Sequence, residues 1–140
     1  MNAIEFLKKA KVAEYRKEVA MEKLMRCKNT VERLTSILSR DRVTSTRDVT
    51  SHETAIIRYM EAQEGAAKAS VEYDEIVDKI EGLISQLDSA TAQSILRLHY
   101  IEGKSMSEVS KEISMCRSRA YHYHTRAIQQ LSNILDNTSR

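Results

Sequence analysis

The chain has 140 residues, of which 41% are hydrophobic and 5% aromatic, and it contains three glycines and no proline. This length allows one or two small domains, and the scarcity of helix breakers predicts an all-α fold. No phosphate-cradling glycine loop and no G-x-S-x-G motif occurs. We therefore expect neither an enzyme nor a cofactor.

The two cysteines, Cys27 and Cys116, have neither a C-x-x-C nor a zinc-site spacing. This favours a reducing, cytoplasmic setting. No apolar run is long enough for export or for a membrane span, so we expect no membrane partner.

The formal net charge of +2 is unevenly distributed along the chain. Residues 1–47 carry 12 basic and 6 acidic side chains, residues 48–88 carry 3 and 10, and residues 89–140 carry 7 and 4. The first two segments therefore have opposite net charges of similar size, whereas the third has a positive net charge.

Residues 3–39 contain no glycine or proline and are expected to form one long helix, or two in line. Residues 40–52, RDRVTSTRDVTSH, are polar and rich in Ser and Thr, which predicts a loop. Thr50 and Glu53 then form a capping box that would open a second helix running to about Leu87. Its expected apolar stripe consists of Ile56, Met60, Val77, Ile80, Ile84 and Leu87.

The opposite charges of these two helices favour an antiparallel hairpin within one chain. The alternative is an intermolecular coiled coil, since Leu24, Val31, Leu34 and Leu38 follow a near-heptad spacing. That spacing does not persist for long enough to decide between the two. A thin hairpin buries little, so residues 1–88 are expected to serve self-association, as in a homodimer, or contact with a partner.

Residues 94–131 have the order of a helix-turn-helix. A helix with an apolar face is followed by Gly103, which suits the left-handed position after a helix end. Ser105 and Glu108 form a capping box for a short helix. Ser114, Met115 and Cys116 are the residues left for the turn.

The helix after this turn has one apolar and one polar face. The apolar stripe consists of Ala120, Tyr123, Ala127, Ile128, Leu131, Ile134 and Leu135. No Asp or Glu occurs from residue 113 to residue 135. The basic side chains of the other face therefore lack an acidic partner on their own helix, and DNA phosphates or guanine would suit them. The alternative is a solvated basic helix without a partner. The exposed candidates are Arg117, Ser118, Arg119, Tyr121, His122, Thr125 and Arg126.

The segment LRLHYIEGKSMSEVSKEI, followed by RSRAYHYHTRAIQQL, resembles the C-terminal, promoter-reading domain of bacterial sigma factors (region 4). The whole chain is similar to small phage and prophage regulators of the ArpU/RinA type. This resemblance implies a sequence-specific regulator of transcription, an activator of phage late genes in the cytoplasm of a bacterial host. It implies contact with RNA polymerase, and it implies that the seven exposed candidates face double-stranded DNA.

Two positions depart from that family pattern. Ser114 stands where a turn glycine is common, and Cys116 stands where Ser or Thr often caps the recognition helix. Cysteine is a weak acceptor and a poor cap. Both changes are expected to loosen the turn without abolishing it.

The expected division is a hairpin of residues 1–88 and a DNA-binding domain of residues 89–140. The alternatives are a DNA-packaging protein like a small terminase subunit, and a helical assembly or interaction protein. His122 and His124 lie on different sides of a helix and do not form a metal site together, so no metal is expected.

Overall fold

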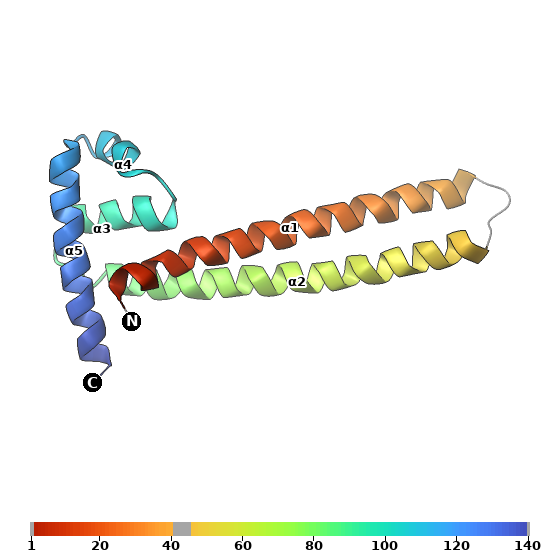
Figure 1. Cartoon of the computed structure of the whole chain (residues 1–140), viewed down its shortest axis with the longest axis horizontal. Coiled ribbons are helices and arrows are strands. Elements are labelled where there is room, and N and C mark those ends of the chain that lie inside the picture. Colours follow the sequence, from red (N-terminus) through yellow and green to blue (C-terminus); the bar gives the residue numbers. More distant parts are fainter. Residues whose placement is uncertain (1, 41–45, 140) are drawn as a thin grey trace. The chain divides into compact units, whose positions relative to one another are not determined.

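The structure, a computed structural model, describes residues 2–40 and 46–139 and confirms the all-α prediction, since no strand occurs in these ranges. Figure 1 shows the helices in chain order. The two long ones confirm the predicted N-terminal helical pair. The helical segments are α1 (Ala3–Arg40), α2 (Thr46–Ile84), α3 (Ala90–Leu96), η1 (Arg97–Ile101), α4 (Met106–Glu112) and α5 (Arg117–Thr138). η1 is a π-helix that continues directly from α3.

The start of α2 corrects two predictions. Residues 46–52 are helical rather than part of a loop, and residues 41–45 lie outside the described residues. Thr50 does not cap the helix, because its Oγ1 donates a hydrogen bond to the Thr46 carbonyl oxygen at 2.9 Å. Thr54 donates to the Thr50 carbonyl in the same way. A hydroxyl satisfied by the carbonyl four residues back is compatible with a helix interior, so a Thr-rich segment can be helical.

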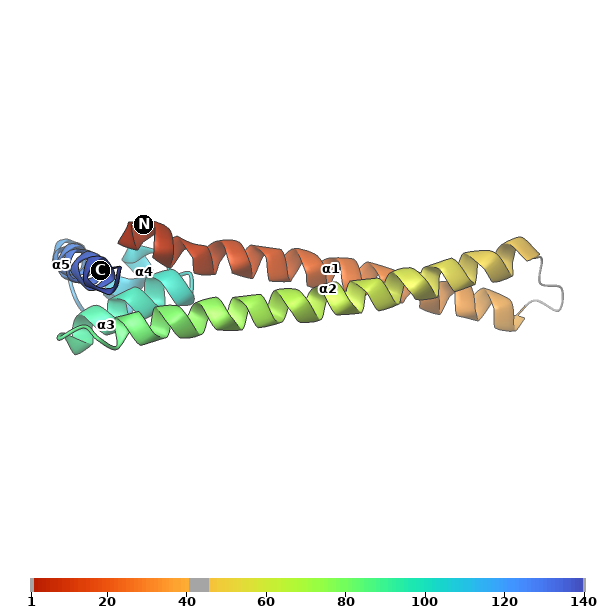
Figure 2. The ribbon, with the colours of Figure 1, turned by 90° about the horizontal axis from the view of Figure 1, so that it is seen from below.

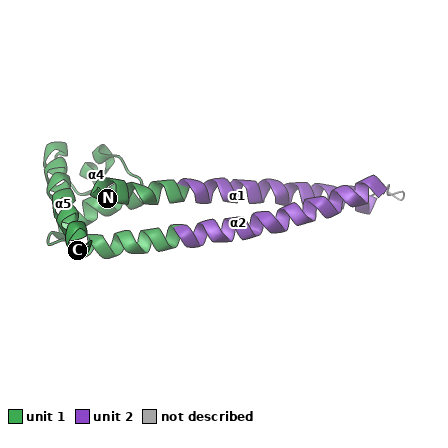
Figure 3. Cartoon of the chain, turned by 60° about the horizontal axis from the view of Figure 1, so that its bottom comes forward, with its two compact units in different colours: residues 1–14, 73–140 green, residues 15–72 purple. Residues whose placement is uncertain are grey.

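The chain forms two compact units (Figure 3). Unit 1 comprises residues 1–14 and 73–140, and unit 2 comprises residues 15–72. These boundaries differ from the expected division at residue 88, because both ends of the hairpin sequence pack with the C-terminal helices. A fragment beginning at residue 89 would therefore lose six of the ten buried residues of a shared core.

The main core of unit 1 joins segments far apart in the sequence. Leu7 of α1, Ile84 of α2, Leu96 of α3 and Leu131 of α5 are each at most 1% exposed and belong to one cluster. Burying a large aliphatic side chain contributes about 1.5–3 kcal/mol, so this cluster provides much of the stability of the unit. It also fixes the C-terminal half of α5.

A second cluster in unit 1 holds α3, α4 and the start of α5 together. Ile95, Val109 and Ala120 are fully buried in it, and Met106 is 6% exposed. The partly buried Ile113 and Met115 cover it from the turn side. The N-terminal half of α5 is therefore packed against α4, as in a helix-turn-helix.

Unit 2 is a helical pair in which the buried residues among those described are all small, whereas many large apolar side chains are exposed. Figure 2 shows α1 and α2 running side by side and crossing once, in opposite chain directions. The described residues buried in this unit are Ala55, Ala62 and Ala66. Met60, predicted for the apolar stripe of this helix, is instead 58% exposed. The positions of α2 that are buried against α1 are occupied by alanines. The other exposed large apolar residues of the unit are Tyr15, Val19, Met21, Met25, Ile37, Val49, Ile57 and Val71.

None of the helices in the described ranges has a stretch both long and apolar enough to cross a bilayer.

Candidate nucleic-acid interface

The start of α4 follows the sequence prediction closely. Gly103 has φ +74°, the left-handed conformation expected after a helix end. Ser105 is the N-cap of α4, and its Oγ accepts a hydrogen bond from the Glu108 amide at 3.2 Å. These two residues set the direction in which α4 leaves η1.

The turn between α4 and α5 is built from the residues that depart from the family pattern. Ser114 has φ +57°, which favours glycine. The Met115 amide donates to the Ser110 carbonyl oxygen at 2.9 Å, which closes the end of α4. Cys116 occupies the N-cap position of α5 with extended backbone, but its side chain makes no capping hydrogen bond. The turn therefore has the expected course with two residues poorly suited to their positions.

Cys116 Sγ lies 3.6 Å from the Ser118 hydroxyl, and this contact and the Arg119 backbone amide lower the pKa of the thiol. The side chain is exposed. A thiol with a lowered pKa deprotonates more readily than an ordinary cysteine.

The seven candidate DNA-contacting residues are all exposed on α5. The opposite face carries Ala120, Ala127 and Leu131, which are at most 2% exposed. One face of α5 is therefore packed in the core of unit 1, and the other face is exposed to solvent. The exposed candidates are Arg117, Ser118, Arg119, Tyr121, His122, Thr125 and Arg126.

The exposed face of α5 has a centre and two edges. Each residue turns the helix by about 100°, so Ser118, His122 and Thr125 lie within about 60° of one another. Gln129, which is exposed and which the sequence prediction omitted, falls in the same arc. Its helical spacing to His122 and Thr125 was the available signal. Arg119 and Arg126 follow one edge of this arc.

Arg117 and Tyr121 follow the other edge. The Arg117 guanidinium lies 5.6 Å from the centroid of the Tyr121 ring. Such a cation–π contact orients the arginine at the helix start without neutralising it.

The arginines of this face keep their charge unpaired. Arg117, Arg119 and Arg126 form no ion pair with any residue in the ranges 2–40 and 46–139. Lys104, which precedes α4, differs from them, since it pairs with Glu112 and Glu102. The exposed face of α5 therefore carries positive charge that no acidic side chain neutralises among the described residues.

A cluster of three rings behind α5 was not predicted from the sequence. His124 Nε2 shares a hydrogen bond of 2.8 Å with the Tyr100 hydroxyl, and the two rings stack with centroids 5.7 Å apart. His99 contacts both rings and donates its Nδ1–H to the Lys104 carbonyl oxygen at 2.7 Å. Burial, and then the nearby His99, lowers the pKa of His124. Because η1 is a π-helix, the sequence spacing did not indicate which of its side chains would face α5.

His122 is exposed and His124 half-buried, so the two lie on different sides of α5 as predicted. In the part of the chain that the structure describes, no group of three or more His, Cys, Asp or Glu side chains could hold a metal ion.

Comparison of the sequence with family models assigns the chain to a family. No match was found among curated proteins or among solved structures. The family described as "Protein of unknown function (DUF1492)" matches residues 50–132. The match extends from α2 into α5 and includes the turn and all seven candidate residues. The chain therefore belongs to the DUF1492 family.

Proposed function

We propose that this protein is a sequence-specific DNA-binding regulator of transcription that reads the major groove with α5. One observation carries the proposal. The seven candidate residues are all exposed on one side of a helix whose other side is buried in two cores. A helix fixed in this way can enter a groove about 12 Å wide without losing its own packing.

The two parts of the exposed face have different proposed roles. Arg117, Arg119 and Arg126 at its edges would contact phosphates, which position the protein. Ser118, His122 and Thr125 at its centre would meet base edges, with Gln129 further along. Polar side chains of these types can donate to or accept from bases.

The proposed biological role follows from the resemblance to ArpU/RinA-type regulators. It is activation of phage or prophage late genes, with the protein contacting RNA polymerase at the promoter.

The test is footprinting of the full chain on DNA that flanks its own gene, followed by selection of bound sites from a random pool. We expect one protected site and an enriched motif. His122→Ala should change the preferred bases, because His122 lies at the centre of the face. Lys8→Ala, which removes an exposed cation on α1 of unit 1, should leave the motif unchanged. Equal recovery of all sequences would contradict sequence-specific binding.

We also propose that unit 2 associates with a second copy of the chain. Its seam buries only alanines among the described residues, while Met25 on α1 and Ile57 and Met60 on α2 are more than half exposed. A two-helix pair with so little buried area is marginal by itself. A second pair would cover these large side chains, and the basic α1 of one copy would suit the acidic α2 of the other.

Light scattering on the full chain tests this association. The expected mass is that of a dimer, and Met25→Glu with Met60→Glu should reduce it to that of a monomer. Gln63→Glu adds one of these two negative charges at an exposed polar position of α2 and should leave the dimer intact. A monomeric parent chain would contradict the proposal.

A further inference from the structure

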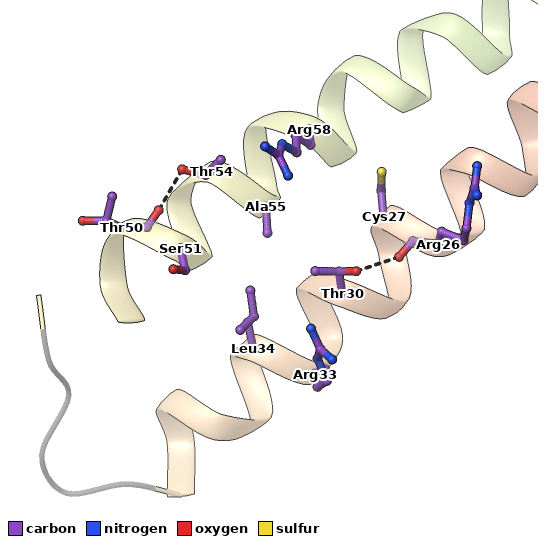
Figure 4. Close-up of a pocket in the computed structure, with 10 residues that line it drawn as sticks. All are labelled: Arg26, Cys27, Thr30, Arg33, Leu34, Thr50, Ser51, Thr54, Ala55 and Arg58. Carbon is purple, nitrogen blue, oxygen red and sulfur yellow. Dashed lines mark hydrogen bonds between the residues drawn. The ribbon is translucent and has the colours of Figure 1, made fainter. Parts of the chain in front are cut away.

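Unit 2 contains a groove of about 570 Å³ between α1 and α2. Figure 4 shows Leu34 and Cys27 on α1 pointing toward α2, and Ala55 on α2 pointing toward α1. These three residues form an apolar floor. Arg26, Arg33 and Arg58 line the groove from both helices. Its volume falls within the range of small-molecule sites, about 300–1,000 Å³.

The charge of this groove is one-sided. No acidic residue and no lysine lines it, although lysines are frequent on α1. Arg26, Arg33 and Arg58 form no ion pair with any residue that the structure describes. Three guanidinium groups around one space repel one another, so the arrangement favours an anion between them.

The three threonine hydroxyls of the groove do not replace the arginines as donors. Thr30 Oγ1 donates to the Arg26 carbonyl at 3.0 Å, and Thr50 and Thr54 likewise donate to their own helix. Their oxygens remain as acceptors. The groove therefore offers guanidinium donors, hydroxyl acceptors and an apolar floor.

We propose that this groove binds a phosphate-bearing ligand of the nucleotide class, with its phosphates on the arginines and its ring on the apolar floor. Guanidinium groups bind phosphate oxygens through two parallel hydrogen bonds. This explains why the cationic residues that line the groove are all arginines. Arg26 and Arg33 are two helical turns apart, about 10 Å along α1, which suits more than one phosphate. The hydroxyl acceptors suit the hydroxyl groups of a sugar.

This site is separate from the proposed DNA-contacting face, since its residues belong to unit 2 and α5 belongs to unit 1. A ligand bound to both helices of the pair would stabilise unit 2 by mass action. The proposed function thus neither requires nor excludes the site.

The experiment is isothermal titration calorimetry of the full chain with ATP, pyrophosphate and adenosine at 150 mM NaCl. We expect saturable binding of ATP, weaker binding of pyrophosphate and none of adenosine. Arg26→Ala with Arg58→Ala should weaken ATP binding at least tenfold. Lys28→Ala with Lys68→Ala removes one exposed cation from each of the same helices, outside the groove, and should change the affinity less than twofold.

A second variant keeps the result independent of folding. Arg26→Lys with Arg58→Lys preserves the charge but not the paired donors, and it should also weaken ATP binding. Absence of saturable ATP binding would overturn the proposal. An equal loss of affinity in the Arg26→Ala, Arg58→Ala variant and in the Lys28→Ala, Lys68→Ala control would overturn it too. An equal loss in an Arg117→Ala, Arg119→Ala variant would place the anion on α5 instead. Equal affinity for pyrophosphate and ATP would contradict the role of the apolar floor.

Discussion

Replacing Ser114 with glycine should stabilise the protein, because the turn before α5 requires a backbone conformation that serine adopts at a cost. Ser114 has φ +57°, where an L-residue is destabilised by about 1 kcal/mol relative to glycine. Glycine also gains freedom in the unfolded chain, which offsets about 0.5 kcal/mol of that gain. The net increase in the free energy of unfolding is therefore about 0.5 kcal/mol, or about 2 °C in Tm.

The assay is thermal and urea unfolding of the full chain followed by circular dichroism. Ser114→Ala is the matched control, since alanine has the same left-handed cost as other L-residues and should give no gain. The side chain of Ser114 is exposed, so its loss removes no buried contact. A lower Tm for the glycine variant, or an equal gain for the alanine variant, would refute the reasoning.

Three further predictions concern stability. Cys116→Ser should add about 0.5–1 kcal/mol to the free energy of unfolding in urea, because the thiol makes no capping hydrogen bond and a serine hydroxyl can; an unchanged midpoint would contradict this. Leu131→Ala should cost about 2–5 kcal/mol, whereas Val12→Ala, at a 52% exposed position, should cost less than about 0.5 kcal/mol. The folded protein lowers the pKa of His124 below its ordinary 6.5, mainly by burial, so the unfolded chain binds more protons. The free energy of unfolding should therefore have its full value above about pH 6.5 and fall at lower pH. His124→Gln should reduce this dependence on pH. An equal dependence in both proteins would contradict the assignment.

The amphipathic character of α5 could be predicted from the sequence, because its apolar residues recur at helical spacing. The short helix α4 was also predictable, since Gly103 and the Ser105–Glu108 pair are local signals that act within a few residues. The same holds for the atypical turn. The family pattern indicates a glycine position at Ser114, and the structure places this residue in the left-handed region.

Features that depend on distant contacts could not be read in this way. Leu7 and Leu131 share one core although they are at opposite ends of the chain, so the extent of unit 1 was not visible in local patterns. The pairing of Tyr100 with His124 depends on the π-helical turn of η1. Met60 fits an apolar stripe by spacing, but the seam of unit 2 closes on smaller side chains.

The start of α2 was missed for a different reason. Ser- and Thr-rich segments favour loops on average, yet Thr50 and Thr54 bond to their own helix and allow it to begin at Thr46. The arginine groove of unit 2 was likewise outside the prediction, since Arg58 faces Arg26 and Arg33 only once the two helices pair.

The most direct test of the account is the salt dependence of binding to duplex DNA, measured by fluorescence anisotropy from 50 to 300 mM NaCl. If Arg117 and Arg119 each contact one phosphate, replacing both with Ala should reduce the slope of log K against log [NaCl] by about 2 per bound copy. Lys8→Ala with Lys11→Ala removes two exposed cations of unit 1 and should leave the slope unchanged. Equal slopes and affinities for the parent chain and the arginine variant would contradict the assignment of α5 as the DNA-reading helix.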